Sequence, residues 1–287
     1  MPRPPIDLAR KIKDIPQHVE PLPGEARAPI LHYRLTSSTT SATLAYVEDA
    51  FDQGSRYNAV VGRHLSRLYG MAMIGLIENF ERFLKEAASE CVDCVAPHTL
   101  DDRFDGFKTK ASGVAAHFGA GSIGKYLCEP ETWLSCAAIN DRFRDVLSDP
   151  FEPGNFYLFP TPKQLPKEAW RSKTMAIVWQ LRHSVVHNVG VITISDAAKL
   201  RILAQEEVVG PRLLVLTRDD IRYLKRFLDE TANWCNTRIA TRLAELLSTL
   251  HGQSPGLLGP QEYANRLASA FRTAVSVAGV TGLVPAD

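Results

Sequence analysis

The segment from Arg182 to Asn188 places two imidazoles and a guanidinium within seven residues. Apolar residues recur at helical spacing before it with no Pro or Gly between them, which predicts a helix from about 167 to 187. His183 and His187 are four residues apart and share one face of that helix, and Arg182 is long enough to reach the same rim. Asn188 and Gly190 are the expected stop residues, because both tolerate the left-handed conformation that ends many helices.

These side chains suit phosphate chemistry on RNA. A neutral imidazole can take a proton from a ribose 2′-hydroxyl near neutral pH. A guanidinium can hold the phosphate through two hydrogen bonds and stabilise the charge that builds up in the transition state. From residue 171 to residue 226 the chain carries ten Lys and Arg against five Asp and Glu. That surplus fits a phosphate-binding surface, although a solvated helix face also gives such counts.

The pattern Arg182-His183-x-x-x-His187-Asn188-x-Gly190 resembles the R-polar-x-x-x-H motif of HEPN-superfamily proteins, in the form often followed by Asn and a nearby Gly. The resemblance implies a helical bundle that dimerises, so that two copies of the motif face each other across a composite cleft. It also implies a metal-independent ribonuclease of the kind found in toxin–antitoxin and antiphage systems. His187 would then activate the 2′-oxygen or protonate the leaving group, Arg182 would hold the phosphate, and His183 would orient the site. Asn188 would support them.

A second long helix is predicted from 58 to about 90, where apolar residues follow one another at steps of three and four. Gly70 and Gly75 within it can let another helix approach closely. HEPN-like proteins often carry a glutamate in the corresponding helix that pairs with the motif arginine, and the resemblance assigns this supporting role to Glu78. Glu81 lies among basic residues, which is the pattern of a solvated face. A purely structural role stays open for both glutamates.

Structural and metal-binding readings of the same residues are also open. A His pair on a half-buried helix face often packs or caps carbonyls. His183-x-x-x-His187 has zinc spacing, but Ser184 stands where an H-E-x-x-H protease needs its glutamate, and no third ligand follows nearby. The 91–98 segment reads C-x-x-C-x-x-x-H, yet a single C-x-x-C without a second pair is weak evidence for zinc. We therefore predict neither a metal nor a cofactor.

A glycine-rich segment at 119–126 offers a weaker alternative, a P-loop nucleotidase. It satisfies G-x-G-x-x-G and matches G-x-x-x-x-G-K, but Tyr126 then replaces the Ser or Thr that holds magnesium. Both motifs need a buried strand before the glycines, and residues 111–118 are weakly β-forming. A loop between helices explains these glycines, and ATP binding that is lost in Lys125→Ala would support the nucleotidase.

The remaining segments complete the prediction of an all-α, HEPN-like helical bundle with loop insertions and at most a minor hairpin. The β-prone runs at 191–194 and 208–216 can form that hairpin, with a polar turn at 195–196 after the first run. The Ser/Thr run at 36–42 is expected as a loop or a helix N-cap. Further helices are expected at 133–147, from 217 to about 250 and after the 252–260 linker to about 277, and a proline-rich loop is expected at 149–166.

The expected domain division has three parts. A proline-rich arm covers 1–35, the helical domain covers 36–250, and a linker with a final helix covers 251–287. Hydrophobic residues make up 45% and charged residues 23% of the chain, as in ordinary globular proteins, and the net charge of +1 gives no global attraction to nucleic acid. Five irregularly spaced cysteines favour a reducing compartment. With no signal-peptide pattern and no apolar run of membrane-spanning length, a cytoplasmic protein that does not enter a membrane is expected.

The leading hypothesis is an RNA endonuclease that works as a homodimer without metal. Single-stranded or looped RNA is the expected substrate, because 2′-hydroxyls there can reach in-line geometry. The resemblance implies an antitoxin or a sensor protein as a further partner. The alternative is a non-catalytic HEPN-like module that binds a nucleotide, RNA or a partner protein in a defence or regulatory complex.

Overall fold

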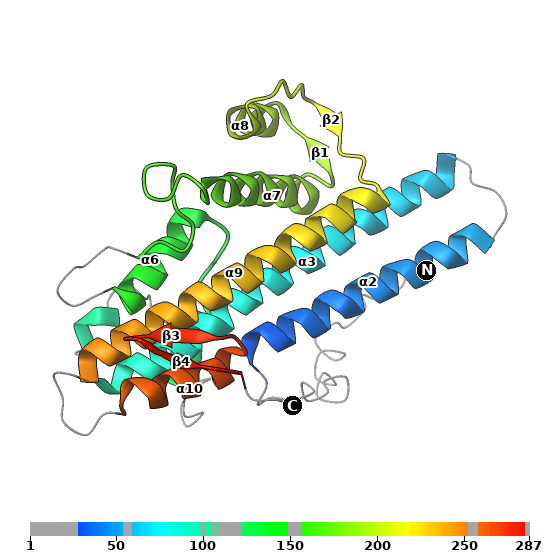
Figure 1. Cartoon of the computed structure of the whole chain (residues 1–287). Coiled ribbons are helices and arrows are strands. Elements are labelled where there is room, and N and C mark those ends of the chain that lie inside the picture. The colour runs from blue at the N-terminus through cyan, green and yellow to red at the C-terminus, as the bar shows by residue number, and fades with distance from the viewer. Residues whose placement is uncertain are drawn as a thin grey trace, which may run out of the picture.

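Three long helices lie side by side and form the body of the protein (Figure 1). They are α2 (Pro29–Gln53), α3 (Ala59–Val95) and α9 (Arg218–His251). The computed structural model describes residues 28–53, 59–98, 101–104, 107, 122–148, 156–251 and 258–284. Over these residues the fold is all-α, with only short antiparallel strand pairs, as predicted.

Helix α3 is the central element, because α2, α5, α6, α7 and α9 all pack against it. Its apolar residues recur at steps of three and four, so one broad face is buried along the helix, and the sequence-predicted helix is confirmed. Tyr33 of α2 lies against the rings of Phe80 and Phe83, with centroids 6.3 and 5.8 Å away. This aromatic cluster joins α2 to α3.

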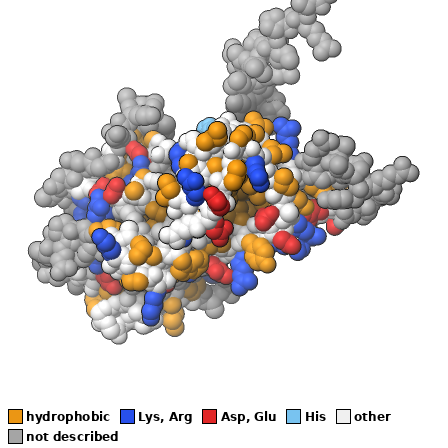
Figure 2. All heavy atoms as spheres, turned by 90° about the horizontal axis from the view of Figure 1, so that it is seen from above, with side chains coloured by type: hydrophobic (Ala, Val, Ile, Leu, Met, Phe, Trp, Pro, Cys, Tyr) orange, Lys and Arg blue, Asp and Glu red, His pale blue; other side chains and the backbone are white. Residues whose placement is uncertain are grey.

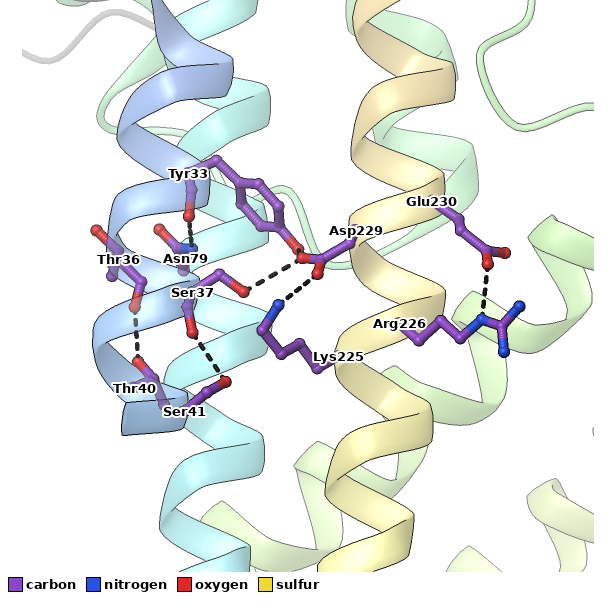
Figure 3. A network of polar contacts seen from close by, with 10 residues as sticks. All are labelled: Tyr33, Thr36, Ser37, Thr40, Ser41, Asn79, Lys225, Arg226, Asp229 and Glu230. Carbon is purple, nitrogen blue, oxygen red and sulfur yellow. Dashed lines mark hydrogen bonds and ion pairs between the residues drawn. The ribbon is translucent and has the colours of Figure 1, made fainter. Parts of the chain in front are cut away.

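A polar layer ties α2 to α9 beside that cluster (Figure 3). The hydroxyls of Tyr33 and Ser37 donate to Asp229 at 2.9 and 3.2 Å, and Lys225 pairs with the same carboxylate. Burial, together with the neighbouring Asp229, raises the pKa of Tyr33 well above its ordinary value, so its proton stays in place. Asn79 of α3 donates to the Tyr33 carbonyl at 2.8 Å, and the layer therefore links all three long helices.

The Ser/Thr run at 36–42 lies inside α2, so its prediction as a loop or N-cap is wrong. Thr39, Thr40 and Ser41 each donate to the carbonyl four residues earlier at 3.0 Å. Ser and Thr side chains can satisfy a helix backbone in this way. Packing against α3 and α9 supplies the stability that the local sequence lacks.

Shorter helices surround the body. They are η2 (Ala96–His98), η3 (Asp101–Phe104), α5 (Ile123–Cys128), α6 (Cys136–Leu147), α7 (Ala169–His187), α8 (Ile194–Ala204) and α10 (Pro260–Phe271). Helices α7 and α8 lie on one side, and α10 packs on the C-terminal part of α9 (Figure 1). The described part of the proline-rich loop contains neither helix nor strand, in agreement with the prediction. No helix among the described residues is both long enough and apolar enough to cross a bilayer.

Two antiparallel strand pairs complete the fold. The first pairs β1 (Val191–Ile192) with β2 (Arg212–Leu213), which confirms the predicted minor hairpin, although α8 lies between the strands. The second pairs β3 (Val275–Val277) with β4 (Val280–Gly282). The predicted tail helix to residue 277 is therefore six residues too long. Val275 and Val277 are buried by strand alternation, and Ala278 and Gly279 form the turn with φ of 49° and 80°.

Gly124 lies inside α5, so the loop predicted for 119–126 is wrong at its C-terminal end, while residues 119–121 lie outside the described residues. A Cβ on Gly124 would lie 2.0 Å from the Ser89 carbonyl oxygen, so glycine is required for α5 to approach α3. The carboxylate of Asp93 accepts from the Ser122 hydroxyl at 2.7 Å and from the Gly124 N–H at 2.8 Å. The start of α5 is thus occupied by a side chain of the protein.

Candidate functional site

Helix α7 holds the motif and runs from Ala169 to His187, as predicted. Its buried face contains Met175, Val178 and Trp179. Near its C-terminal end α7 comes close to α3, because a Cβ on Gly70 would lie 3.4 Å from Val185 Cγ1. Gly70 therefore has the close-approach role expected of it, whereas a Cβ on Gly75 would meet nothing within 4 Å.

The predicted partner of the motif arginine is in contact with it. Arg182 Nη2 lies 3.3 Å from Glu78 Oε1, which brings α7 and α3 together at the level of the motif. The Arg182 side chain is 16% exposed and that of Glu78 is 54% exposed, so the pair sits at the edge of the core. The buried Nε of Arg182 has no hydrogen-bond partner in the described part of the chain. The guanidinium is held in place but keeps unused donor capacity.

Glu81 has a structural role, and its expected place on a solvated face is wrong. Its side chain is 15% exposed, accepts from the backbone N–H of Trp133 at 3.2 Å and pairs with Lys85 at 3.4 Å. The chain before α6 folds over this part of α3 and covers it. The two glutamates lie three residues apart on the same helix, and their contacts differ only because different segments pack over them.

The two motif imidazoles are exposed and touch each other, with ring centroids 4.7 Å apart and planes inclined by 43°. His183 and His187 lie about 100° and 140° round the helix axis from Arg182. Within the described residues, no hydrogen bond joins the guanidinium to either imidazole. One chain therefore presents an imidazole pair and a separate guanidinium at the same end of α7.

The helix ends where it was predicted to end, with Asn188 as its C-cap, but the backbone conformations of the stop residues differ from the prediction. Asn188 has φ of −115°, and the left-handed residues are Val189 and Gly190, with φ of 53° and 82°. The Gly190 N–H donates back to the Ser184 carbonyl at 3.0 Å, which closes the last turn. Of the two predicted stop residues only Gly190 is left-handed, and Val189 adopts a conformation that costs a β-branched residue energy.

Asn188 is instead committed to a buried carboxylate that the sequence analysis missed. Asp196 is 2% exposed and accepts from Asn188 Nδ2 and Gln180 Nε2, both at 2.8 Å. It also accepts from the N–H of Thr193, whose hydroxyl in turn accepts from the N–H of Asp196. Burial alone would raise the pKa of Asp196, but these hydrogen bonds together with that from Ser184 outweigh it and lower the pKa. The network fixes the motif end of α7 against α8.

The signal for this network was present in the sequence. Thr193-Ile-Ser-Asp196 is a capping box, which marks the start of a helix, and Thr193 is the N-cap of α8. The polar turn predicted at 195–196 is wrong for that reason. The short β-prone run before it masked the start of the helix, because all four residues from 191 to 194 are β-branched.

Exposed apolar side chains surround the end of α7. They are Val186, Val189, Val191, Ile194, Leu213 and Val215, with exposed fractions from 37% to 72%. Figure 2 looks onto the α7–α8 side of the molecule, where hydrophobic and basic side chains are interspersed. We call this set the apolar rim. Several large exposed apolar side chains near one helix end are typical of interaction sites.

The cysteine segment does not form a metal centre among the described residues, where no three His, Cys, Asp or Glu side chains are placed to hold an ion. Cys91 is buried, Cys94 is half-buried, and both are free thiols. Burial raises the pKa of Cys94 to about 11 and that of Cys91 well above its ordinary value. These thiols are protonated near neutral pH.

No protein-family model, no curated protein and no solved structure matches this chain. A function for this protein is therefore inferred from its fold and from the contacts that the motif residues make.

Proposed function

We propose that the protein is a metal-independent endoribonuclease of HEPN type whose reacting groups are Arg182, His183 and His187. The observation that carries the proposal is their shared place at the end of α7. Two exposed imidazoles touch there, and Glu78 holds a guanidinium at the same end of the helix. The network of Asp196 keeps this helix end fixed, and fixed groups catalyse better than mobile ones.

The cleavage needs no cofactor, because the attacking group belongs to the substrate. His187 takes the proton of a ribose 2′-hydroxyl, and the 2′-oxygen attacks the adjacent phosphorus. The bond from phosphorus to the 5′-oxygen breaks, and a second imidazole gives its proton to that oxygen. The products are a 2′,3′-cyclic phosphate and a free 5′-hydroxyl. Arg182 binds the non-bridging oxygens and stabilises the charge on them.

A complete site requires two copies of the chain in this proposal. Arg182 and His187 of one chain lie about 140° apart round the axis of α7, so one phosphate between them is reached more easily across a dimer. The apolar rim lies next to the imidazoles and gives a second copy a surface to bury. Each composite site then takes the imidazoles of one copy and the guanidinium of the other.

The activity is tested by incubating the purified full-length protein with single-stranded RNA in EDTA. We expect cleavage to continue without metal and to leave cyclic phosphate ends. His187→Ala and Arg182→Ala should each reduce the rate by about a hundredfold or more. His98→Ala, which removes an imidazole at the other end of α3, is the matched control and should keep the wild-type rate. Cleavage that stops in EDTA, or that survives His187→Ala, would contradict the mechanism.

The composite site has its own test. We expect Arg182→Ala and His187→Ala proteins, each inactive alone, to recover activity when they are mixed and refolded together. Half of the dimers are then mixed and each has one intact site, so the recovered rate should be about a quarter of wild type. If each site belongs to a single chain, mixing restores nothing.

The separation of guanidinium and imidazoles within one chain also favours a second candidate. This is a non-catalytic HEPN-like module that binds a nucleotide, RNA or a partner protein. It predicts that RNA binds but stays intact, and that Glu78→Gln, which frees Arg182, changes RNA affinity without producing cleavage.

A ribonuclease of this kind needs restraint in its host. We therefore include in the proposal an antitoxin or sensor protein as partner, a role in toxin–antitoxin or antiphage defence, and a cytoplasmic location. The five free cysteines fit a reducing compartment.

A further inference from the structure

A second concave site lies on α9, away from the motif. It is a pocket of about 320 Å³ between α9 and the chain at Phe156. Its other lining residues are Thr237, Arg238, Thr241, Arg242 and Glu245. Thr237, Thr241 and Glu245 follow one another at steps of four, and so do Arg238 and Arg242. Two adjacent rows of side chains on α9 therefore face the pocket. Two guanidiniums, two hydroxyls and one carboxylate converge there.

Arg238 is preorganised in this pocket by its neighbours. Its guanidinium carbon lies 4.9 Å from the ring centroid of Trp234 and 5.7 Å from that of Phe156. One of its N–H groups donates to the Tyr157 carbonyl at 3.1 Å. Its buried Nε has no acceptor in the described part of the chain. A cation stacked in this way keeps one orientation and offers its remaining donors to a ligand.

The charge at Arg238 lacks an anion of its own. Burial lowers the pKa of this guanidinium, and no ion pair with it is formed among the described residues. Arg242 is paired with Glu245 at 3.2 Å and donates to the Leu147 carbonyl at 3.0 Å. Among the described residues, two guanidiniums and one carboxylate line the pocket, so a bound anion would meet a net positive lining.

We propose that this pocket binds the phosphate group of a nucleotide, either free or within a nucleic-acid strand. The guanidiniums of Arg238 and Arg242 match phosphate oxygens in geometry, and the hydroxyl of Thr241 adds a neutral donor. The volume is at the lower end for small-molecule sites, which suits a mononucleotide. The ladder of Trp234, Arg171 and Trp170 beside Arg238, with ring-to-guanidinium distances of 5.3 and 4.6 Å, offers stacking surface next to the phosphate. This site does not depend on ribonuclease activity.

The test uses the full-length protein and three probes. Adenosine 5′-monophosphate and adenosine are titrated by calorimetry, and a short fluorescein-labelled single-stranded DNA, which lacks the 2′-hydroxyl needed for cleavage, is titrated by anisotropy. We expect saturable binding of the monophosphate, of the DNA or of both, and much weaker binding of adenosine. Binding of the monophosphate alone identifies a free nucleotide as the ligand, and binding of the DNA alone identifies a strand phosphate.

Variants locate the site. Arg242→Gln should weaken binding by about tenfold or more, and Thr241→Val, which keeps the side-chain shape, should weaken it by about threefold. Arg226→Gln is the matched control, because Arg226 is on the same helix, is 77% exposed and pairs with Glu230 (Figure 3). Neither residue lines the pocket. The melting temperature of each variant checks its folding. Thr241→Val serves as the second variant if Arg242→Gln fails to fold.

Three results would overturn the inference. The first is the absence of binding of both phosphate-containing probes, and the second is adenosine binding as tightly as its monophosphate. The third is binding that is lost in His187→Ala but kept in Arg242→Gln and Thr241→Val, which would place the ligand at the motif instead. Failure of RNA cleavage with binding intact would reject the proposed ribonuclease and leave this pocket supported.

Discussion

Removal of the Asp196 carboxylate is the sharpest test of how the motif end of α7 is held. Asp196→Ala deletes the acceptor for Asn188, Gln180 and the Thr193 N–H. Loss of the capping-box bond between the Thr193 N–H and the Asp196 carboxylate costs about 1 kcal/mol. The side-chain amides of Asn188 and Gln180 also lose their charged hydrogen-bond acceptor. Both side chains are half-buried and can turn toward water, so this loss adds about 1–2 kcal/mol rather than the full cost of leaving two buried donors unpaired. The free energy of unfolding should therefore fall by about 2–3 kcal/mol.

The pH dependence of that loss gives a second, independent check. The folded-state pKa of Asp196 is lowered, so the ionised form contributes stability above its ordinary value of 3.8. This contribution disappears as the pH falls through the lower folded value. The difference between wild type and Asp196→Asn, measured by urea unfolding, should be larger at about pH 7 than at about pH 3.

A matched control separates the network from a general effect of helix charge. Asp219 is also in the first turn of a helix, but it is 74% exposed and only pairs with Arg222. Asp219→Ala should cost less than about 1 kcal/mol. An Asp196→Ala protein within about 0.5 kcal/mol of wild type, or a difference that is the same at both pH values, would refute the assignment of a stabilising network here.

Further predictions concern backbone positions. Gly124→Ala should destabilise the protein by about 2–3 kcal/mol in urea unfolding, because the new Cβ would lie 2.0 Å from the Ser89 carbonyl oxygen; a neutral result would mean that α5 does not pack there. Gly75→Ala in α3 should stabilise by up to about 1 kcal/mol, since its Cβ meets nothing within 4 Å and alanine favours helix, and a loss of stability would contradict the open space. Val189→Gly should stabilise by about 1 kcal/mol by removing strain at φ of 53°; destabilisation would show that the Val189 side chain is needed.

The periodicity of apolar residues in the sequence was sufficient to predict the long helices α3, α7 and α9. The helices at α3, α7 and α9 were predicted because apolar residues recur at one spacing over many turns, which leaves few alternative structures. The Ser/Thr run in α2 carries no such pattern. Its helix depends on packing against α3 and α9, and on hydroxyls that bond within the helix, and neither is visible locally.

Some residues near the motif were predicted from the sequence and others were missed, because some of their contacts form only in the folded chain. Glu78 was assigned to Arg182 from a resemblance, and the structure brings the two into contact. Asp196 was missed because a buried carboxylate acquires its role from partners that converge only in the folded chain. The capping box was the one local signal that could have revealed it.

The two proposed sites lie toward opposite ends of α7, which makes their tests separable. At its N-terminal end Arg171 lies over the rings of Trp170 and Trp234, and Trp234 is the ring that also stacks on Arg238. The imidazole of His187 lies about 25 Å further along the helix at 1.5 Å per residue. Substitutions that far apart and without shared partners act additively. A variant of the α9 pocket that abolished RNA cleavage in a fully folded protein would therefore indicate one strand bound across both sites, and not structural damage spreading from one to the other.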